Sequence, residues 1–216
     1  MLTINLNLIL VVVFCYLVGS IPNGYLLTKA LHGKDITKEG SGNVGTLNTF
    51  QVSRSKMLAG VVLLLDFLKG FLPVVIMLYV VKLSVVDIFF SSCFIIIGHN
   101  FSIWLKFKGG RGLASSAGIF IVLNYTLLIT WCIVWLLFYA VKRDVLFSNI
   151  FATIIIPVVA IVFRRMYISA MLPFMPESSY GYFIIFLLII TFLILYKHRF
   201  VFSRFIPLTE KRLNEE

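Results

Sequence analysis

Long apolar segments follow one another through the whole sequence and constrain its fold more than any other feature. Several approach or exceed the roughly 20 residues that a bilayer-spanning helix needs, as in 57–81 and 180–196. The chain is 60% hydrophobic and 13% charged, against about 45–50% and about 25% in a soluble domain. This composition excludes a disordered chain. It predicts an all-α, polytopic membrane protein, because helices satisfy their own backbone hydrogen bonds in lipid.

We expect about seven transmembrane helices, each bounded by Lys, Gly or polar clusters. The run 113–141 is too long for one upright helix, and the polar pair Asn124 and Tyr125 divides it into two spans. Pro173 and Pro176 mark a loop before the last span. The predicted spans are 4–31, 57–81, 85–105, the two halves of 113–141, 148–163 and 180–196. No period of 20 to 50 residues repeats, so 1–216 is expected to form a single helical domain.

The basic residues predict the orientation of these spans, because cytoplasmic loops are enriched in Lys and Arg. With the N-terminus outside, only Lys82, Arg164 and Arg165 fall on the outer side, and Lys69 lies within a span. The other 15 of the 19 basic residues are Lys29, Lys34, Lys38, Arg54, Lys56, Lys106, Lys108, Arg111, Lys142, Arg143, Lys197, Arg199, Arg204, Lys211 and Arg212. We therefore expect an outside N-terminus and a cytoplasmic C-terminus.

Charge and cysteine content exclude two further classes of function. The net charge of +10 is explained by topology and by attraction to anionic headgroups, and no soluble nucleic-acid-binding module fits between the apolar runs. Cys15, Cys93 and Cys132 lie in separate apolar segments without CxxC spacing. We therefore expect no nucleic-acid partner, no disulfide framework and no metal site.

A glycine-rich loop on the predicted inner face is the first candidate site. It holds Gly40, Ser41, Gly42, Asn43 and Gly45, with Asn48 close behind. Closely spaced glycines let the backbone approach a ligand and direct N–H groups at an anion, and Ser and Asn side chains add donors. The alternative is a plain turn between helices.

The second candidate is a diglycine, Gly109-Gly110, between the cations Lys108 and Arg111. Open N–H groups flanked by two cations suit a phosphate or an acyl phosphate; the alternative is a basic topological anchor. His99, at the end of the preceding span, is either a general base or a residue that caps a helix end.

Three other polar features remain within or beside the spans. Asp66 and Lys69 stand at i, i+3 spacing and are expected to form a buried ion pair. The break at Gly19-Ser20-Ile21-Pro22 predicts a packing kink whose freed backbone groups are satisfied by neighbouring helices. His198, just after the last span, is either part of a snorkelling basic tail or a second base beside phosphate.

These residues together resemble the bacterial acyl-phosphate:glycerol-3-phosphate acyltransferases, in order and over nearly the whole chain. The matching positions are Gly19-Ser20-Ile21-Pro22, Gly24-Tyr25, Lys29, Asp35-Ile36, Gly40-Ser41-Gly42-Asn43, Gly45, Asn48, Leu65-Asp66-Phe67-Leu68-Lys69-Gly70, Gly98-His99, Phe107-Lys108-Gly109-Gly110, Gly112 and His198-Arg199.

The resemblance implies a seven-helix enzyme of the bacterial cytoplasmic (inner) membrane with its active site at the cytoplasmic surface. Such an enzyme moves an acyl group from acyl phosphate to the 1-hydroxyl of glycerol 3-phosphate, releases lysophosphatidic acid and phosphate, and needs neither a metal or other cofactor nor acyl-CoA.

The resemblance also assigns roles to the candidate residues. Phosphate or the substrate hydroxyl is bound by Ser41, Gly42 and Asn43, with Asn48 and His99 also in the substrate site. Acyl phosphate is bound by Lys108, Gly109, Gly110 and Arg111. His198 holds glycerol 3-phosphate. Ser41, Arg111 and His198 are the expected catalytic residues, and membrane lipids surround the protein.

The sequence departs from the family pattern at several positions. Gln51 replaces an Arg, Arg111 a Lys, Leu146 and Asn149 two serines, and Phe200-Val201 a Glu-Asn pair. These departures leave open a catalytically weak paralogue with a regulatory role. A carrier for a small phosphorylated solute is a third alternative, although a carrier is expected to place its polar contacts near the bilayer midplane.

Overall fold

The computed structural model describes residues 6–170 and 176–202, with side chains as far as Arg199. The expectations that fall on 1–5, on Pro173 and on Arg204, Lys211 and Arg212 lie outside the described residues. The described chain is an assembly of helices with one isolated β-bridge, between Ser102 and Lys108. The all-α prediction is therefore confirmed for this part of the chain.

Five helical segments in the described chain are long and apolar enough to cross a membrane, and two apolar helices are shorter. The long segments are α1 (Leu6–Ser20) with α2 (Asn23–His32), α4 (Lys56–Ile76) with the π-helical turn Met77–Val81, α7 (Tyr125–Lys142), α8 (Val145–Val162), and the short 3₁₀ turn Glu177–Ser179 with α10 (Tyr180–Phe202). The shorter helices are α5 (Val85–Asn100) and α6 (Leu113–Leu123). These helices overlap the seven stretches expected from the sequence, and five of them are long enough to span a membrane.

Asn124 separates α6 from α7, as the sequence predicts. Its side-chain oxygen accepts a hydrogen bond from the Leu127 N–H at 3.2 Å and so caps the start of α7. Its amide nitrogen donates to the carbonyl oxygen of Tyr167 at 3.0 Å. The polar residue is therefore satisfied inside the bundle although apolar helices flank it.

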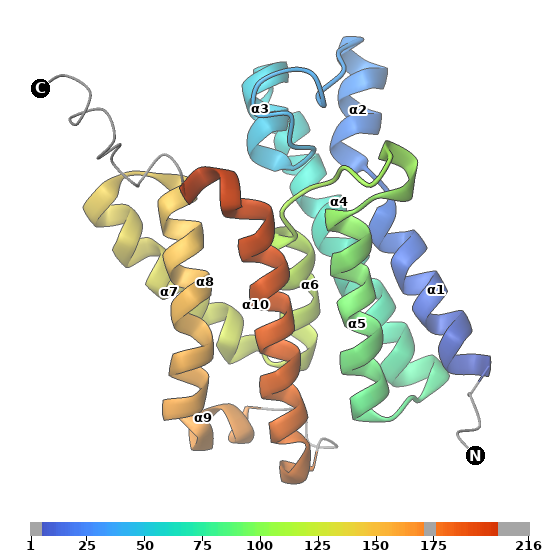
Figure 1. Cartoon of the computed structure of the whole chain (residues 1–216), viewed down its shortest axis with the longest axis vertical. Helices are drawn as coiled ribbons and strands as arrows, with labels where there is room; N and C mark the ends of the chain where they lie inside the picture. Colours follow the sequence, from blue (N-terminus) through green and yellow to red (C-terminus); the bar gives the residue numbers. More distant parts are fainter. Residues whose placement is uncertain (1–5, 171–175, 203–216) are drawn as a thin grey trace, which may run out of the picture.

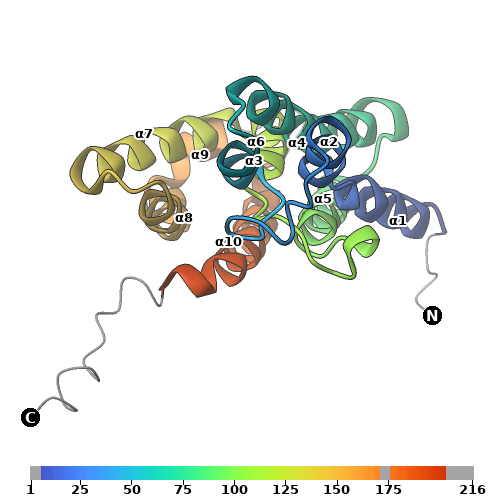
Figure 2. The ribbon, with the colours of Figure 1, turned by 90° about the horizontal axis from the view of Figure 1, so that it is seen from above.

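The helices run side by side and alternate in direction, so that the loops gather at two ends (Figure 1). One end carries α2, α3 (Thr46–Ser53), the α5–α6 loop, the α7–α8 turn and the last turns of α10; α9 (Arg164–Ser169) lies at the opposite end. Seen from above, α7 and α8 form a pair on the side of the bundle away from α1 (Figure 2). Large apolar side chains such as Leu136, Leu137 and Phe192 are exposed, which suits lipid contact.

Glycines allow two helix pairs to approach closely. A Cβ atom at Gly19 or Gly98 would overlap backbone atoms across the α1–α5 contact, and one at Gly70 or Gly118 would overlap backbone atoms across the α4–α6 contact. Small residues at membrane helix contacts permit such backbone approach. The glycine loop before α3 and the loop between α5 and α6 are therefore supported by closely packed helices.

Candidate functional site

A cavity of about 890 Å³ opens between α4, α6, α7, α8 and α10 beneath the α2–α3 and α5–α6 loops. Ser41, Asn43, Lys56 and Arg111 line it at the loops and first turns of helices, and further polar residues, such as Asp66 and Thr153, line it within the helices. Its apolar wall lies deeper in the bundle and includes Leu63, Phe120, Leu128, Trp131, Leu187 and Ile190. The cavity therefore offers a polar end and an apolar body.

The glycine loop is held in place by Asn48, which is 2% exposed. The side-chain nitrogen of Asn48 donates to the carbonyl oxygens of Ile36, Glu39 and Asn43 at 2.8–3.1 Å, and its oxygen accepts from the Ser41 N–H at 2.8 Å. Both polar atoms of this side chain are thus engaged by the loop. Sequence reasoning placed Asn48 in the substrate site; the structure gives it a loop-organising role at the cavity wall.

The same loop needs glycine at two positions, because Gly40 and Gly42 adopt φ values of +59° and +69°. The Gly42 N–H donates to the Glu39 carbonyl oxygen, so Gly42 serves the turn itself and is absent from the cavity lining. The exposed Ser41 and the half-buried Asn43 do line the cavity. Of the three residues expected to hold phosphate, these two reach the open space.

Just before the glycine loop, Asp35 organises the chain that leaves α2. Its carboxylate accepts a hydrogen bond from the Thr37 hydroxyl at 2.6 Å and from the Thr37 N–H at 3.1 Å, and Lys38 lies 3.9 Å away. The Thr37 hydroxyl in particular lowers the pKa of this half-buried carboxyl. Asp35 is therefore ionised at neutral pH and tightens the turn that presents Ser41.

Two helices begin at the cavity without a side-chain cap. Gly45 precedes α3 and Gly112, with φ of +86°, precedes α6. Both glycines and the first residue of each helix line the cavity. The free N–H groups and the positive dipole end of a helix favour an anion at this position. Arg111 adds a full positive charge beside the start of α6.

The diglycine packs against the end of α5. The Gly110 N–H donates to the His99 carbonyl oxygen at 2.9 Å, and a Cβ atom at Gly110 would overlap the His99 ring. A Cβ atom at Gly109 would overlap the carbonyl oxygens of His99 and Asn100. The expectation that both N–H groups stand open for phosphate is therefore wrong for Gly110. Close packing on α5 explains why glycine is needed at both positions.

The two cations beside the diglycine separate in the structure. Arg111 lines the cavity, whereas Lys108 is exposed and absent from the lining. The backbone of Lys108 bridges to Ser102, and this bridge turns the loop before it reaches Gly110. The structure therefore joins only one of the two predicted cations to the candidate site.

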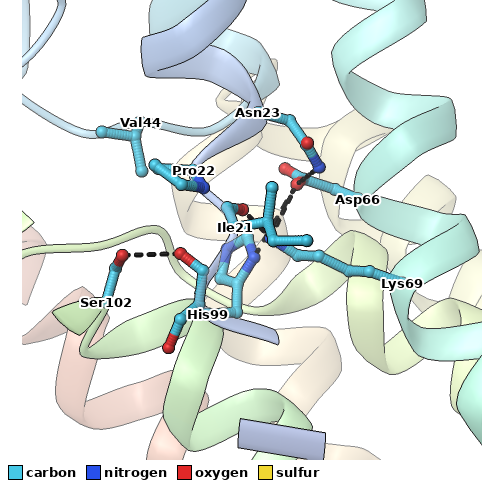
Figure 3. A pocket seen from close by; sticks show the side chains of 9 residues that line it. Ile21, Pro22, Asn23, Val44, Asp66, Lys69, His99 and Ser102 are labelled. Atoms are coloured by element: carbon cyan, nitrogen blue, oxygen red, sulfur yellow. Dashed lines mark hydrogen bonds and ion pairs between the residues drawn. The ribbon is translucent and has the colours of Figure 1, made fainter. Parts of the chain in front are cut away.

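A buried charge cluster adjoins the cavity; Figure 3 shows its side chains. The Lys69 ammonium is 2.9 Å from the Asp66 carboxylate and also donates to the Ile21 carbonyl oxygen at 2.9 Å. The Asn23 amide nitrogen donates to the same Asp66 oxygen at 3.0 Å. The predicted ion pair is confirmed. The predicted kink is confirmed as well, because α1 ends at Ser20 and Lys69 satisfies the carbonyl that the break releases.

His99 connects this cluster to the cavity, and so does Asp66, because both line the two sites. His99 is 5% exposed, its Nδ1 lies 3.3 Å from the Ser115 hydroxyl and 4.0 Å from Asp66, and its Nε2 edge faces Gly110. Both ring nitrogens thus have close protein neighbours. The geometry favours a structural wall over a general base at this residue.

His198 is fully buried near the end of α10. Its Nδ1 lies 2.8 Å from the Ile194 carbonyl oxygen, one turn back in the same helix. The ring is absent from the cavity lining, and its Nε2 has no hydrogen-bond partner among the described residues. This buried position outside the cavity lining matches neither of the two expectations for His198, a snorkelling basic tail or a base beside the phosphate.

Sequence reasoning missed the part of the site formed by α7 and α8. Trp131 and Trp135 of α7, with Asn149 and Thr153 of α8, line the cavity. The signal was present as two aromatic and two polar residues at i, i+4 spacing, which places each pair on one helix face. Of the departures from the family pattern, Arg111 and Asn149 line the cavity, whereas Gln51 and Leu146 do not.

The described residues contain no group of three or more His, Cys, Asp or Glu side chains placed to hold a metal ion. The charged groups that do surround the cavity are Lys56, Asp66 and Arg111. Two of these three are cations, so the chemistry that this site offers is anion binding through cations and helix N-termini.

Comparison with known proteins gives the same family from sequence and from structure. The family described as glycerol-3-phosphate acyltransferase matches residues 9–207. A glycerol-3-phosphate acyltransferase from Pelagibacter ubique is 39% identical over 158 residues, which cover 73% of this chain and 80% of the relative. One from Anaplasma phagocytophilum is 35% identical over 203 residues, covering 92% of this chain and 95% of the relative.

The fold is similar to crystal structures of PlsY, described as an integral membrane glycerol 3-phosphate acyltransferase, in its glycerol 3-phosphate and lysophosphatidic acid forms. Each superposes with a TM-score of 0.77 at 30% identity and covers 93% of this chain and 92% of PlsY. The resemblance inferred from the motifs is confirmed, and the chain is a multi-pass membrane protein. It belongs to the glycerol-3-phosphate acyltransferase family.

Proposed function

We propose that this chain transfers an acyl group from acyl phosphate to the 1-hydroxyl of glycerol 3-phosphate, giving lysophosphatidic acid and phosphate. Family membership supports the acyltransferase activity and the glycerol 3-phosphate acceptor. The observation that carries the proposal is the cavity, whose polar end holds Arg111 and two uncapped helix N-termini and whose body is apolar. An acyl phosphate has the same division between an anionic head and an apolar chain.

The substrates' phosphate groups bind at the loop end of this cavity. Ser41 and Asn43 donate hydrogen bonds from the glycine loop, and Arg111 neutralises the charge that develops on the leaving phosphate. His99, Gly109 and Gly110 form the wall behind the reacting groups. Lys108 stays at the exposed mouth, where it attracts anionic substrates, and His198 supports the last turns of α10.

The acyl chain lies between α4, α6, α7, α8 and α10. Residues such as Leu63, Phe120, Leu128 and Ile190 supply the apolar surface for it. Burial of each CH₂ group contributes about 0.8 kcal/mol, so this wall provides binding energy that holds the reactive head at the loop end.

The transfer reaction does not require a strong protein base. The 1-hydroxyl oxygen of glycerol 3-phosphate attacks the carbonyl carbon of acyl phosphate and forms the ester bond. The bond between that carbon and the bridging phosphate oxygen breaks, and the phosphate leaves with the electron pair. The leaving phosphate accepts the hydroxyl proton, and Nδ1 of His99 already contacts the Ser115 hydroxyl.

The direct test is an assay of the purified protein with acyl phosphate and radiolabelled glycerol 3-phosphate, with acyl-CoA as a competing donor. We expect labelled lysophosphatidic acid to form from acyl phosphate and not from acyl-CoA. Formation of product from acyl-CoA alone would contradict the proposed donor. An inactive protein that retains its helix content and unfolding midpoint would instead favour the weak paralogue.

The carrier alternative is less favoured by the position of the polar groups. Ser41, Asn43, Lys56 and Arg111 lie near one end of the bundle, at loops and helix starts, whereas a carrier is expected to bind its substrate near the midplane. The cavity body beneath them is lined mainly by apolar side chains, which a small phosphorylated solute does not need.

We infer a seven-span topology for a single domain in the bacterial cytoplasmic membrane, with the N-terminus outside and the C-terminus inside. The five long apolar segments and the two shorter ones support the number of spans. The cation-rich loops gather at the end of the bundle that carries the glycine loop (Figure 1). Cytoplasmic enrichment of basic residues therefore assigns that end to the cytoplasm.

Cysteine labelling in intact cells tests this orientation. In a background with Cys15, Cys93 and Cys132 replaced by Ser, Ser178→Cys is expected to react with an impermeant thiol reagent, and Ser41→Cys is expected to resist it. Both serines are exposed, and their segments, the α2–α3 loop and the turn before α10, lie at opposite ends of the bundle (Figure 1). Labelling of the Ser41 variant after membrane permeabilisation is the control, and its labelling in intact cells would reverse the orientation.

A further inference from the structure

Two tryptophans of α7 bond to two polar side chains of α8 along one wall of the cavity. The Trp135 indole N–H donates to the Asn149 side-chain oxygen at 2.7 Å, and the Trp131 indole N–H lies 3.2 Å from the Thr153 hydroxyl oxygen, which accepts it. Each pair is one helical turn from the other. All four residues line the cavity, so this contact both joins the helices and faces the bound substrate.

The Trp135 bond fixes the orientation of the Asn149 amide. An indole nitrogen can only donate, so the atom that faces Trp135 is the amide oxygen and the NH₂ group points elsewhere. That NH₂ group donates no hydrogen bond to any residue in the described chain, although Asn149 is 8% exposed. The amide nitrogen is not enclosed by protein atoms, so its N–H groups are open to the cavity that Asn149 lines.

Thr153 provides an internal comparison. Its hydroxyl accepts from Trp131 and donates to the Asn149 backbone carbonyl at 2.6 Å. The hydroxyl proton therefore has a protein partner, and Thr153 has no remaining donor for a ligand. The two pairs look alike in the helix contact, but only the Asn149 pair keeps N–H groups available to the cavity.

We propose that Asn149 is a catalytic residue whose amide N–H groups bind the carbonyl oxygen of the acyl donor. This inference rests on the proposed acyl-phosphate function. Asn149 lies in the second turn of α8, between Val145 at the start of the helix and Ile156 deeper in the apolar wall, and all three line the cavity. In an acyl phosphate, the carbonyl group likewise lies between the anionic phosphate and the apolar chain.

A neutral amide suits this role. The carbonyl oxygen gains negative charge when the hydroxyl of glycerol 3-phosphate attacks, and a donor held in place beforehand stabilises that charge without reorganisation. Trp135 is the positioning residue, because its N–H holds the Asn149 oxygen and so directs the NH₂ group. A hydrogen bond that strengthens at this stage raises kcat more than it lowers KM.

The test compares kcat and KM of four variants in the acyl-phosphate assay. Asn149→Asp keeps the size and the acceptor for Trp135 but removes both donors, so kcat is expected to fall about 100-fold with the KM for glycerol 3-phosphate unchanged. Asn149→Ser is expected to recover part of this loss. Trp135→Phe leaves the amide in place but unaligned, so a smaller fall in kcat is expected. Ser148→Ala, at the neighbouring position of α8 and outside the cavity lining, is the matched control and is expected to stay within about threefold of the parent.

A second measurement separates catalysis from folding. Each variant is titrated with a non-hydrolysable acyl phosphonate while its thermal unfolding midpoint is recorded in detergent. Asn149→Asp is expected to unfold near the parent and to bind the phosphonate more weakly. Parent-like kcat in Asn149→Asp, or a loss equal to that of Ser148→Ala, would overturn the role of Asn149. A folded parent without transfer from acyl phosphate would overturn the proposed function itself, and this inference with it.

Discussion

Replacing Lys69 with Met is expected to lower the free energy of unfolding by about 3–5 kcal/mol, because it leaves a buried carboxylate without its cation. Lys69 and Asp66 are 2.9 Å apart with side chains 6% and 3% exposed, so water cannot replace the lost partner. The variant also removes the donor that satisfies the Ile21 carbonyl at the α1–α2 kink. Equilibrium unfolding in detergent micelles measures the change.

Two variants control for this result. Lys142→Met removes an exposed cation at the end of α7 and is expected to cost at most about 1 kcal/mol. The double variant Asp66→Leu/Lys69→Met removes both charges and is expected to recover part of the stability, because no unpaired charge remains. If Lys69→Met unfolds at the same denaturant concentration as Lys142→Met, the buried pair does not contribute to the stability of the fold.

Arg111→Ala is expected to reduce transfer from acyl phosphate by roughly 10- to 150-fold in kcat/KM. The loss of a charge-assisted hydrogen bond to an ionised group costs about 1.5–3 kcal/mol, and each 1.36 kcal/mol is a factor of about ten in rate. Arg111 is the cation that precedes the uncapped start of α6 in the cavity wall. Steady-state kinetics with varied acyl phosphate measures the effect.

The same loop supplies a matched control for Arg111. Lys106 is exposed and absent from the cavity lining, so Lys106→Ala removes one positive charge from the loop without changing the cavity. It is expected to keep kcat/KM within about threefold, whereas Arg111→Lys is expected to recover much of the lost activity because it restores the charge. Equal losses in Lys106→Ala and Arg111→Ala would mean that general attraction of anions, and not a contact at Arg111, supports turnover.

The Lys69 and Arg111 predictions concern two adjoining parts of the protein, the buried charge cluster and the cavity wall. Asp66 and His99 belong both to the buried cluster and to the cavity wall. The Lys69 variant is therefore expected to lose activity through displacement of that wall, whereas the Arg111 variant is expected to lose activity while its unfolding remains close to that of the parent. Measuring stability and kinetics on both variants separates the two effects.

The sequence by itself determined the features that depend on local chemistry. Apolar length identifies membrane helices because each helix satisfies its own backbone in lipid, and Asn124 marks a helix start because its side chain caps the next turn. The Asp66–Lys69 pair was predictable because residues three apart share a helix face. The ordered motifs also identified the family, which is a property of the whole sequence pattern.

Only the tertiary structure decided which polar groups face the cavity and which serve the fold. Asn48 and Gly110 carry residue types suited to phosphate binding, yet their donors are taken by the loop and by His99. Asn149 counted as a departure from the family pattern, yet the indole of Trp135 on the neighbouring helix fixes its amide at the cavity. The sequence does not show whether a hydrogen-bond donor is bonded within the protein or available to a ligand. Its partner often lies in a distant segment, which only tertiary packing brings close.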